Sequence, residues 1–221
     1  MSTPARHNFV EVSGNETLEH LSALGLALPQ LLDPLALACA QALEVDTDHP
    51  VGSAGQLIYM WATAGLRRST RASGWIAQRE KNIEWTISPN RRWRINVMAG
   101  DEATGYEGVM PHSRYPRGAE GQRQATQRIL QPQLVIPQLR PLQSAATLGP
   151  VNYALLHCID VRSGVVRAEL SIPADHDKSG RVTEWGKRIL LPNVQLGGNG
   201  NVSAIPQPSP TPVIQVRRRQ P

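Results

Sequence analysis

Residues 160–172 read Asp-Val-Arg-Ser-Gly-Val-Val-Arg-Ala-Glu-Leu-Ser-Ile, and this stretch is typical of a β-hairpin. Ser163-Gly164 supplies the turn, because glycine readily adopts the backbone angles that tight hairpin turns require. After the turn, polar residues alternate with the apolar residues Val166, Ala168, Leu170 and Ile172. Alternation with a period of two predicts a strand that buries one of its faces.

The turn also predicts the register of the hairpin. A two-residue turn would place Asp160 opposite Arg167, on the polar face of the pair. Pro173 is expected to end the second strand, because proline cannot donate a hydrogen bond to a neighbouring strand. Beyond the following loop, residues 181–191 are expected to add a further strand or a short helix that carries Trp185.

Helical spacing dominates the first part of the chain. Apolar periodicity and capping residues favour three helices, at 16–26, 34–43 and 53–66. Ser13 or Asn15 is expected to cap the first and Asp33 the second, with Pro34 in the first turn of that helix. Trp61 falls on the apolar face of the third helix, which predicts that it is buried.

A β-meander is predicted after these helices. Its strands are expected at 75–79, 83–87 and 93–97, and Pro89-Asn90-Arg91 is typical of the intervening turn. In this arrangement Trp85 and Trp93 are expected to pair across two neighbouring strands.

Together these patterns predict an α+β fold, with N-terminal helices packed on antiparallel β-meanders. A proline-rich crossing at 131–150 separates the first meander from the second. We expect residues 1–196 to form a single α+β domain, with two lobes, 1–130 and 150–196, as the alternative. Residues 197–221 are rich in proline and glycine and lack periodicity, so they are expected to form a flexible, disordered basic tail.

The composition indicates the cellular compartment in which the protein is expected. The two cysteines, Cys39 and Cys158, lie in apolar runs, which predicts buried thiols in a reducing compartment. The chain has no Cys-x-x-Cys motif that would bind zinc. Its N-terminal stretch is polar, and no apolar run approaches the roughly 20 residues needed to span a bilayer. We therefore expect a cytoplasmic protein without a membrane segment, a metal or a cofactor.

Arginine is the main functional signal. The formal net charge is +5, and arginine, whose planar guanidinium grips phosphate through two parallel hydrogen bonds, supplies most of the positive charge. Trp93 and Tyr115 lie among the arginines and are candidates for stacking on bases. The candidate nucleic-acid-binding residues are Arg67, Arg68, Arg71, Arg91, Arg92, Arg94, Arg114, Arg117, Arg217, Arg218 and Arg219. The alternative interpretation is that these arginines form ordinary solvated faces.

Catalytic signals are sparse. A divalent-metal nuclease places carboxylates on adjacent strands, and Asp160 and Glu169 fall on one face of the predicted hairpin. The position that such sites give to lysine holds Ser171, and Arg167 is expected opposite Asp160, which favours a cross-strand ion pair in a surface charge cluster instead. Asp175-His176-Asp177 and the loop Gly100–Gly105 are expected to be solvated turns, because adjacent loop residues seldom converge on one ion.

We therefore expect a non-enzymatic accessory protein that binds DNA or RNA, or a nucleoprotein partner, through arginine-rich loops. One alternative is a divalent-metal-dependent nuclease that uses Asp160 and Glu169 as catalytic residues. Another is a protein-interaction subunit of a larger assembly, with a protein partner or a second copy of the chain bound to it.

Overall fold

A mixed β-sheet of nine strands forms the centre of the computed structural model, which describes residues 9–116, 118, 149–196 and 202–205. Seven strands follow the order β1-β7-β6-β5-β4-β3-β2, and β8 extends the sheet from β6 and pairs with β9. The strands are β1 (Val10–Val12), β2 (Ile76–Glu80), β3 (Ile83–Ile87), β4 (Trp93–Ala99), β5 (Val151–Asp160), β6 (Val165–His176), β7 (Val182–Leu190), β8 (Asn193–Leu196) and β9 (Val202–Ile205).

Most neighbouring strands are antiparallel, and β1–β7 and β4–β5 are parallel. The α+β fold with N-terminal helices is therefore confirmed, and the strand β9 lies within the segment expected to be a tail. Because β4 pairs with β5, the strands before and after the proline-rich crossing belong to one continuous sheet. The crossing itself lies almost entirely outside the described residues.

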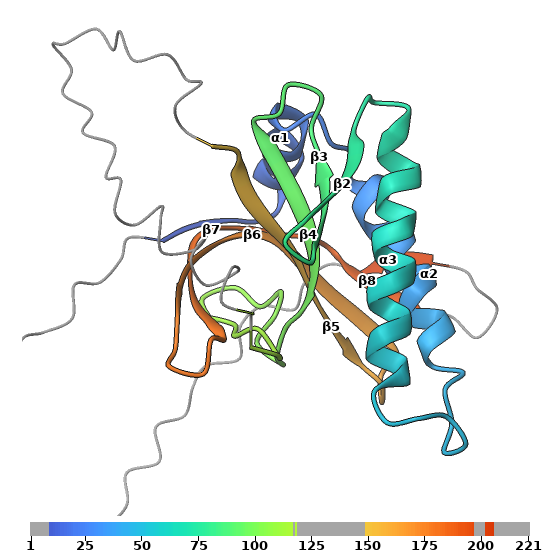
Figure 1. Cartoon of the computed structure of the whole chain (residues 1–221). Helices are drawn as coiled ribbons and strands as arrows, with labels where there is room; N and C mark the ends of the chain where they lie inside the picture. Colours follow the sequence, from blue (N-terminus) through green and yellow to red (C-terminus); the bar gives the residue numbers. More distant parts are fainter. Residues whose placement is uncertain (1–8, 117, 119–148, 197–201, 206–221) are drawn as a thin grey trace, which may run out of the picture.

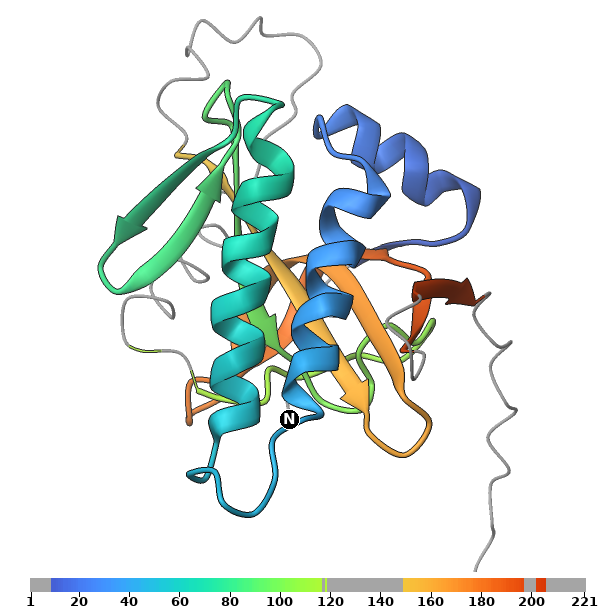
Figure 2. The same cartoon turned by 90° about the vertical axis from the view of Figure 1, so that its right-hand side faces the viewer.

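Three helices precede β2: α1 (Asn15–Ala23), α2 (Leu28–Ala42) and α3 (Ser53–Arg71). Figures 1 and 2 show α2 and α3 side by side over one face of the sheet, and α1 beyond the start of α2. The predicted side-chain cap of α1 is wrong, because Gly14 occupies the N-cap position and no side chain bonds there.

The predicted start of α2 at Pro34 is also wrong, because the helix begins at Leu28 and runs through this proline. Proline has no N–H for the carbonyl four residues earlier, which leaves the Gln30 carbonyl without its usual helical donor. The Ser69 hydroxyl of α3 donates to that carbonyl at 2.8 Å. Gly65 of α3 lies against Pro34, where a Cβ would come within 2.5 Å of the Pro34 Cβ. The missing side chain at Gly65 thus lets the two helices approach closely.

The core fills the space between these helices and the sheet. Leu31, Leu35 and Leu66 of the helices are at most 1% exposed, as are Ile95 of β4 and Leu170 of β6. Val166, Ala168 and Leu170 all belong to this core, which confirms the face predicted by their alternation. Burial at this scale is the main favourable term that holds the helices on the sheet.

The predicted hairpin register is wrong. Asp160 pairs with Val165 and Cys158 with Arg167, so the connection contains four residues, 161–164. The Asp160 carboxylate explains the longer loop, because it accepts hydrogen bonds from the backbone N–H of Arg162 at 3.0 Å and from the Ser163 hydroxyl at 2.7 Å. Local side-chain bonds of this kind stabilise turns in competition with strand pairing.

The strand end predicted at Pro173 is wrong as well, because β6 continues to His176. The register of β6 against β7 shifts between Ile172 and Pro173 and again after Pro173. A proline is accommodated at such an irregularity because no regular ladder hydrogen bond from its nitrogen is needed.

The predicted cross-strand pair of Trp85 and Trp93 is wrong too. Thr86 pairs with Ile95 and Ile87 with Arg94, so the two tryptophans lie on opposite faces of the sheet. Trp93 packs edge-on against Tyr153 of β5, with ring centroids 6.5 Å apart. Trp85 is fully buried on the other face, beneath the guanidinium of Arg94.

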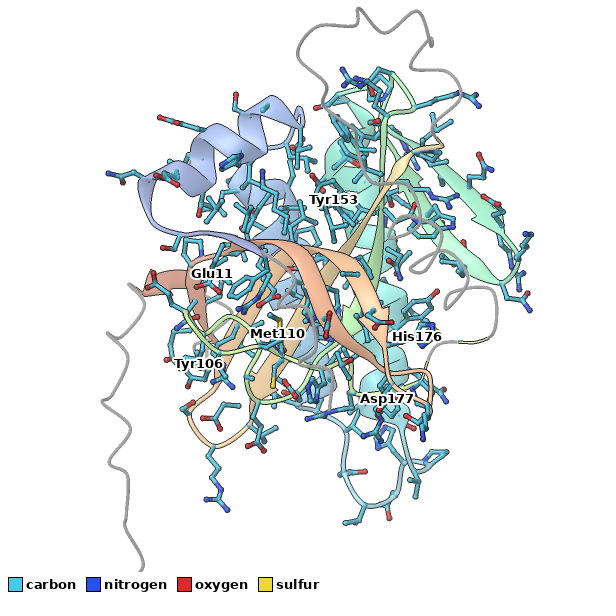
Figure 3. The ribbon with its side chains drawn as sticks, turned by 90° about the vertical axis from the view of Figure 1, so that its left-hand side faces the viewer. Glu11, Tyr106, Met110, Tyr153, His176 and Asp177 are labelled. Carbon is cyan, nitrogen blue, oxygen red and sulfur yellow. The ribbon has the colours of Figure 1, made fainter. Side chains whose placement is uncertain are left out.

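The segment 100–113 covers part of the sheet face that lies away from α2 and α3. Ser113 and Val182 of β7 exchange hydrogen bonds of 2.9 Å, and the Trp185 indole donates to the Pro111 carbonyl at 2.7 Å. Figure 3 views this face and labels Glu11, Tyr106 and Met110 where the segment crosses the sheet. Across the described part of the chain, no single helix has the length and apolar character to cross a membrane, and α1 with α2 meets that test only as a pair bent by 101°.

Candidate nucleic-acid interface

Exposed arginines from two elements meet at one end of the molecule. Arg68 and Arg71 lie in the last turns of α3, and Arg91 and Arg92 lie in the turn between β3 and β4. The two elements are neighbours, because a Cβ added at Gly74, just after α3, would lie 3.2 Å from the Pro89 ring. Both elements stand at the upper end in Figures 1 and 2. We refer to Arg68, Arg71, Arg91 and Arg92 as the arginine end.

The β3–β4 turn has its own hydrogen bonds, which fix its backbone. The Asn90 carboxamide oxygen accepts from the Ser88 hydroxyl at 2.8 Å and from the Arg92 N–H at 3.0 Å. Arg91 has a φ of 56°, in the left-handed region that side chains other than glycine seldom occupy. The turn therefore presents two consecutive arginine side chains to solvent from an ordered backbone.

The arginine end carries positive charge that no carboxylate of the described residues neutralises. Among the described residues, no acidic side chain forms an ion pair with any of its four arginines. The guanidinium of Arg68 lies over the Trp61 ring at 5.8 Å, and that of Arg92 lies over the Trp93 ring at 4.9 Å. Such stacking orients a guanidinium and leaves its N–H donors free for an anion.

Two of the predicted arginines have structural partners instead. Arg67 bonds Glu84 at 2.7 Å and the Trp85 carbonyl at 3.2 Å, which ties α3 to β3. Arg94 is 8% exposed and bonds Glu80 at 2.7 Å and Asn152 at 2.6 Å. Because each of these guanidiniums is paired with a glutamate and is at most 23% exposed, we leave Arg67 and Arg94 out of the candidate contact surface.

The other predicted positions lie elsewhere. Arg114 lies beside Ala99, at the end of β4 that is remote from the arginine end. Its backbone N–H donates to the Ala99 carbonyl at 2.9 Å, and the exposed Tyr115 is the next residue in the chain. Arg117 and Arg217–Arg219 lie outside the described residues. The α2–α3 loop, at the lower end in Figures 1 and 2, carries the exposed acidic residues Glu44, Asp46 and Asp48. The exposed charge of this loop is therefore opposite in sign to that of the four arginines of the arginine end.

Glu169, the first of the two candidate nuclease carboxylates, lies in a buried charge network. Its two oxygens accept from Arg188 Nε at 3.1 Å and Nη2 at 2.6 Å, from the Ser171 hydroxyl at 2.7 Å and from the Gly105 N–H at 3.0 Å. Glu169 and Arg188 are both 0% exposed. All the lone pairs that a metal ion would use are therefore engaged in hydrogen bonds.

Arg188 extends this network to β1 and to the covering segment. Its Nη1 donates to Glu11 at 2.5 Å and to the Val109 carbonyl at 2.8 Å, and its Nη2 donates to the Tyr106 carbonyl at 3.1 Å. Nearby, Arg167 donates to the carbonyls of Thr104 and Glu102, each at 3.1 Å. We define Glu11, Glu169 and Arg188 as the buried charge network. The hydrogen bonds of Arg188 and Glu169 to the backbone of this segment hold residues 100–113 against the sheet.

Asp160, the second nuclease candidate, is the last residue of β5 and shares a sheet face with Glu169. Asp160 pairs with Val165, and Glu169 lies four residues further along β6, or about 13 Å at strand spacing. Hydrogen bonds from the Ser163 hydroxyl, then from the Arg162 and Ser163 N–H groups, lower the pKa of Asp160. The structure therefore does not bring these two carboxylates together.

The remaining polar motif, Asp175-His176-Asp177, forms the end of β6 and the turn after it. The Asp177 carboxylate accepts from the N–H groups of Ser179, at 2.8 Å, and Arg181, at 3.0 Å, and the Ser179 hydroxyl bond leads the lowering of its pKa. Figure 3 labels His176 and Asp177 at this end of β6. Within the described ranges, no group of three histidine, cysteine or acidic residues is arranged to hold a metal ion.

The sequence pattern does not identify Trp61 as an exposed neighbour of Arg68 in the arginine end. Trp61 follows the spacing of the apolar face of α3, yet it is 40% exposed and stands outside the core. The available signal was Arg68, seven residues later and therefore on the same side of a helix.

Comparison with models of known families, with curated proteins and with solved structures gives no match. A function is therefore inferred from the geometry of the arginine end.

Proposed function

We propose that this protein is a non-enzymatic accessory protein that binds nucleic acid, free or within a nucleoprotein partner, through the arginine end. The single observation that carries the proposal is that four exposed arginines gather there, none with an acidic partner among the described residues and two of them over tryptophan rings. Arginines with acidic neighbours would be explained by ion pairs within the protein, as Arg67 is by Glu84. Uncompensated arginines on ordered elements are suited to phosphate groups.

The acidic residues of the α2–α3 loop, which is remote from the arginine end, support the same proposal. A polyanion is attracted to the arginine end and repelled by the acidic loop between α2 and α3, so the approach of the ligand is oriented. The β3–β4 turn contributes a fixed backbone, which lowers the conformational cost of placing Arg91 and Arg92 against a phosphodiester chain.

The test compares binding of fluorescein-labelled oligonucleotides by the wild-type chain and a triple variant, Arg71→Gln, Arg91→Gln and Arg92→Gln, by fluorescence anisotropy. Among the described residues, the side chains of these three arginines form no ion pair, and only that of Arg92 lies over an aromatic ring, that of Trp93, so the melting temperature is expected to stay near the wild-type value. Losing three phosphate contacts reduces the salt slope by about 2 for single strands. Between 50 and 200 mM salt, wild-type affinity should then fall by about 20-fold more than that of the variant.

A matched control removes the same charge from elsewhere on the surface. The control variant carries three exposed arginines changed to glutamine, at Arg114, Arg162 and Arg181. Each triple change lowers the formal net charge of +5 by three. Equal losses of affinity in the two variants would show that net charge, and not the arginine end, determines binding. Absence of binding by the wild-type chain at low salt would reject the proposal and favour a protein partner.

A further inference from the structure

Trp61 is the least explained large side chain near the arginine end. Of the other tryptophans, Trp75, Trp85 and Trp185 are at most 4% exposed, whereas Trp61 is 40% exposed on the outer side of α3. Leu37 of α2 and Met60 of α3 are also exposed, at 59% and 56%. Tryptophan surface left in water costs free energy that core packing would recover, so a ligand that covers the ring is favoured.

The position of Trp61 relates it to the arginines by helix geometry. Arg68 follows by seven residues, which is about two turns and 10 Å along the same side of α3. Arg71 lies about 15 Å from Trp61 along the axis, next to the β3–β4 turn. A nucleic-acid strand that contacts Arg71, Arg91 or Arg92 and continues along α3 therefore passes Arg68 and then Trp61.

We propose that Trp61 is a stacking platform for an unpaired base, so that the arginine end binds single strands in preference to duplexes. An exposed indole, with a guanidinium over its ring at 5.8 Å, offers a π-surface and positive charge together. Unpaired bases stack on such surfaces, whereas bases in a duplex are already stacked and offer only phosphates. The inference rests on the proposed function and names the class of nucleic acid that the surface takes.

The variants Trp61→Leu and Trp61→Phe test this assignment. The probes are a labelled oligothymidylate of about 12 nucleotides, within the range of about 4–16 that single-strand-binding domains occupy, and a labelled duplex. Loss of one stacked base lowers single-strand affinity roughly 5- to 140-fold, so Trp61→Leu is expected to show a loss in this range. Trp61→Phe keeps an aromatic ring and should retain more of the affinity, and duplex affinity should stay unchanged in both variants.

Tyr115→Leu provides the matched control, because Tyr115 is 60% exposed and follows the far end of β4. A melting curve for each variant separates loss of binding from loss of folding. The inference is overturned if Trp61→Leu leaves single-strand affinity unchanged, or if Tyr115→Leu reduces it equally. If the arginine triple variant still weakens binding in that case, only the stacking role of Trp61 fails. If the wild-type chain binds neither probe, the proposed function fails as well.

Discussion

The substitution Glu169→Gln distinguishes a structural carboxylate from a catalytic one. Glu169 and Arg188 are both fully buried, and two hydrogen bonds of 2.6 and 3.1 Å join them. Removing one partner of a buried ion pair typically costs 3–5 kcal/mol, because the other charge stays buried without compensation. Arg188 still pairs with Glu11, and glutamine keeps one carbonyl oxygen as an acceptor. We therefore expect a loss near the lower limit, about 3 kcal/mol.

Equilibrium urea denaturation, followed by tryptophan fluorescence and circular dichroism, measures this loss. For a chain of this length, about 3 kcal/mol corresponds to a melting temperature lower by about 6–12 °C. Glu44→Gln is the matched control, because Glu44 is exposed on the α2–α3 loop, and its effect should stay within about 0.5 kcal/mol. If Glu169→Gln has wild-type stability and removes a magnesium-dependent cleavage of nucleic acid, the structural role assigned to Glu169 is wrong and the nuclease alternative holds.

Two further predictions concern the fold. Burial lowers the pKa of His157 to about 4, so below its ordinary value near 6.5 the unfolded chain binds a proton that the folded chain does not. Stability should therefore fall by about 2 kcal/mol between pH 7 and pH 5 in urea titrations of the wild-type chain, and His157→Gln should remove that part of the pH dependence. In α3, Gly65→Ala should cost about 1–2 kcal/mol because its Cβ meets Pro34. Gly55→Ala should stabilise by about 0.5–1 kcal/mol, because among the described residues its Cβ would meet only the Tyr115 hydroxyl, at 3.8 Å. Equal thermal shifts of the two glycine variants would contradict the proposed packing of α2 on α3.

Local patterns predicted those parts of the fold that depend on neighbouring residues. The alternation around Leu170 identified its buried face, because a strand places every second side chain on the same side. The hairpin register was not predictable in the same way, because the Asp160 carboxylate stabilises a four-residue loop. Continuation of a helix through Pro34 depends on the Ser69 hydroxyl from another helix, which no local pattern reveals.

The candidate site also depends on contacts between distant parts of the chain, which local patterns do not predict. The arginine clusters around positions 68 and 91 were visible in the sequence, but their meeting depends on the packing of Gly74 against Pro89. Arg94 follows Arg92 by two residues, but it lies within β4, where Glu80 and Asn152 from other strands bind its guanidinium. The buried charge network joins Glu11 and Arg188, which are 177 residues apart, so spacing in the sequence could not predict it.

The most direct test of the central claim is the salt dependence of single-strand binding by the wild-type chain and by the triple variant at Arg71, Arg91 and Arg92. We expect salt-sensitive binding by the wild-type chain, and a slope of log affinity against log salt that is shallower by about 2 in the variant. Identical slopes and affinities for the two proteins would contradict the proposal that the arginine end binds nucleic acid.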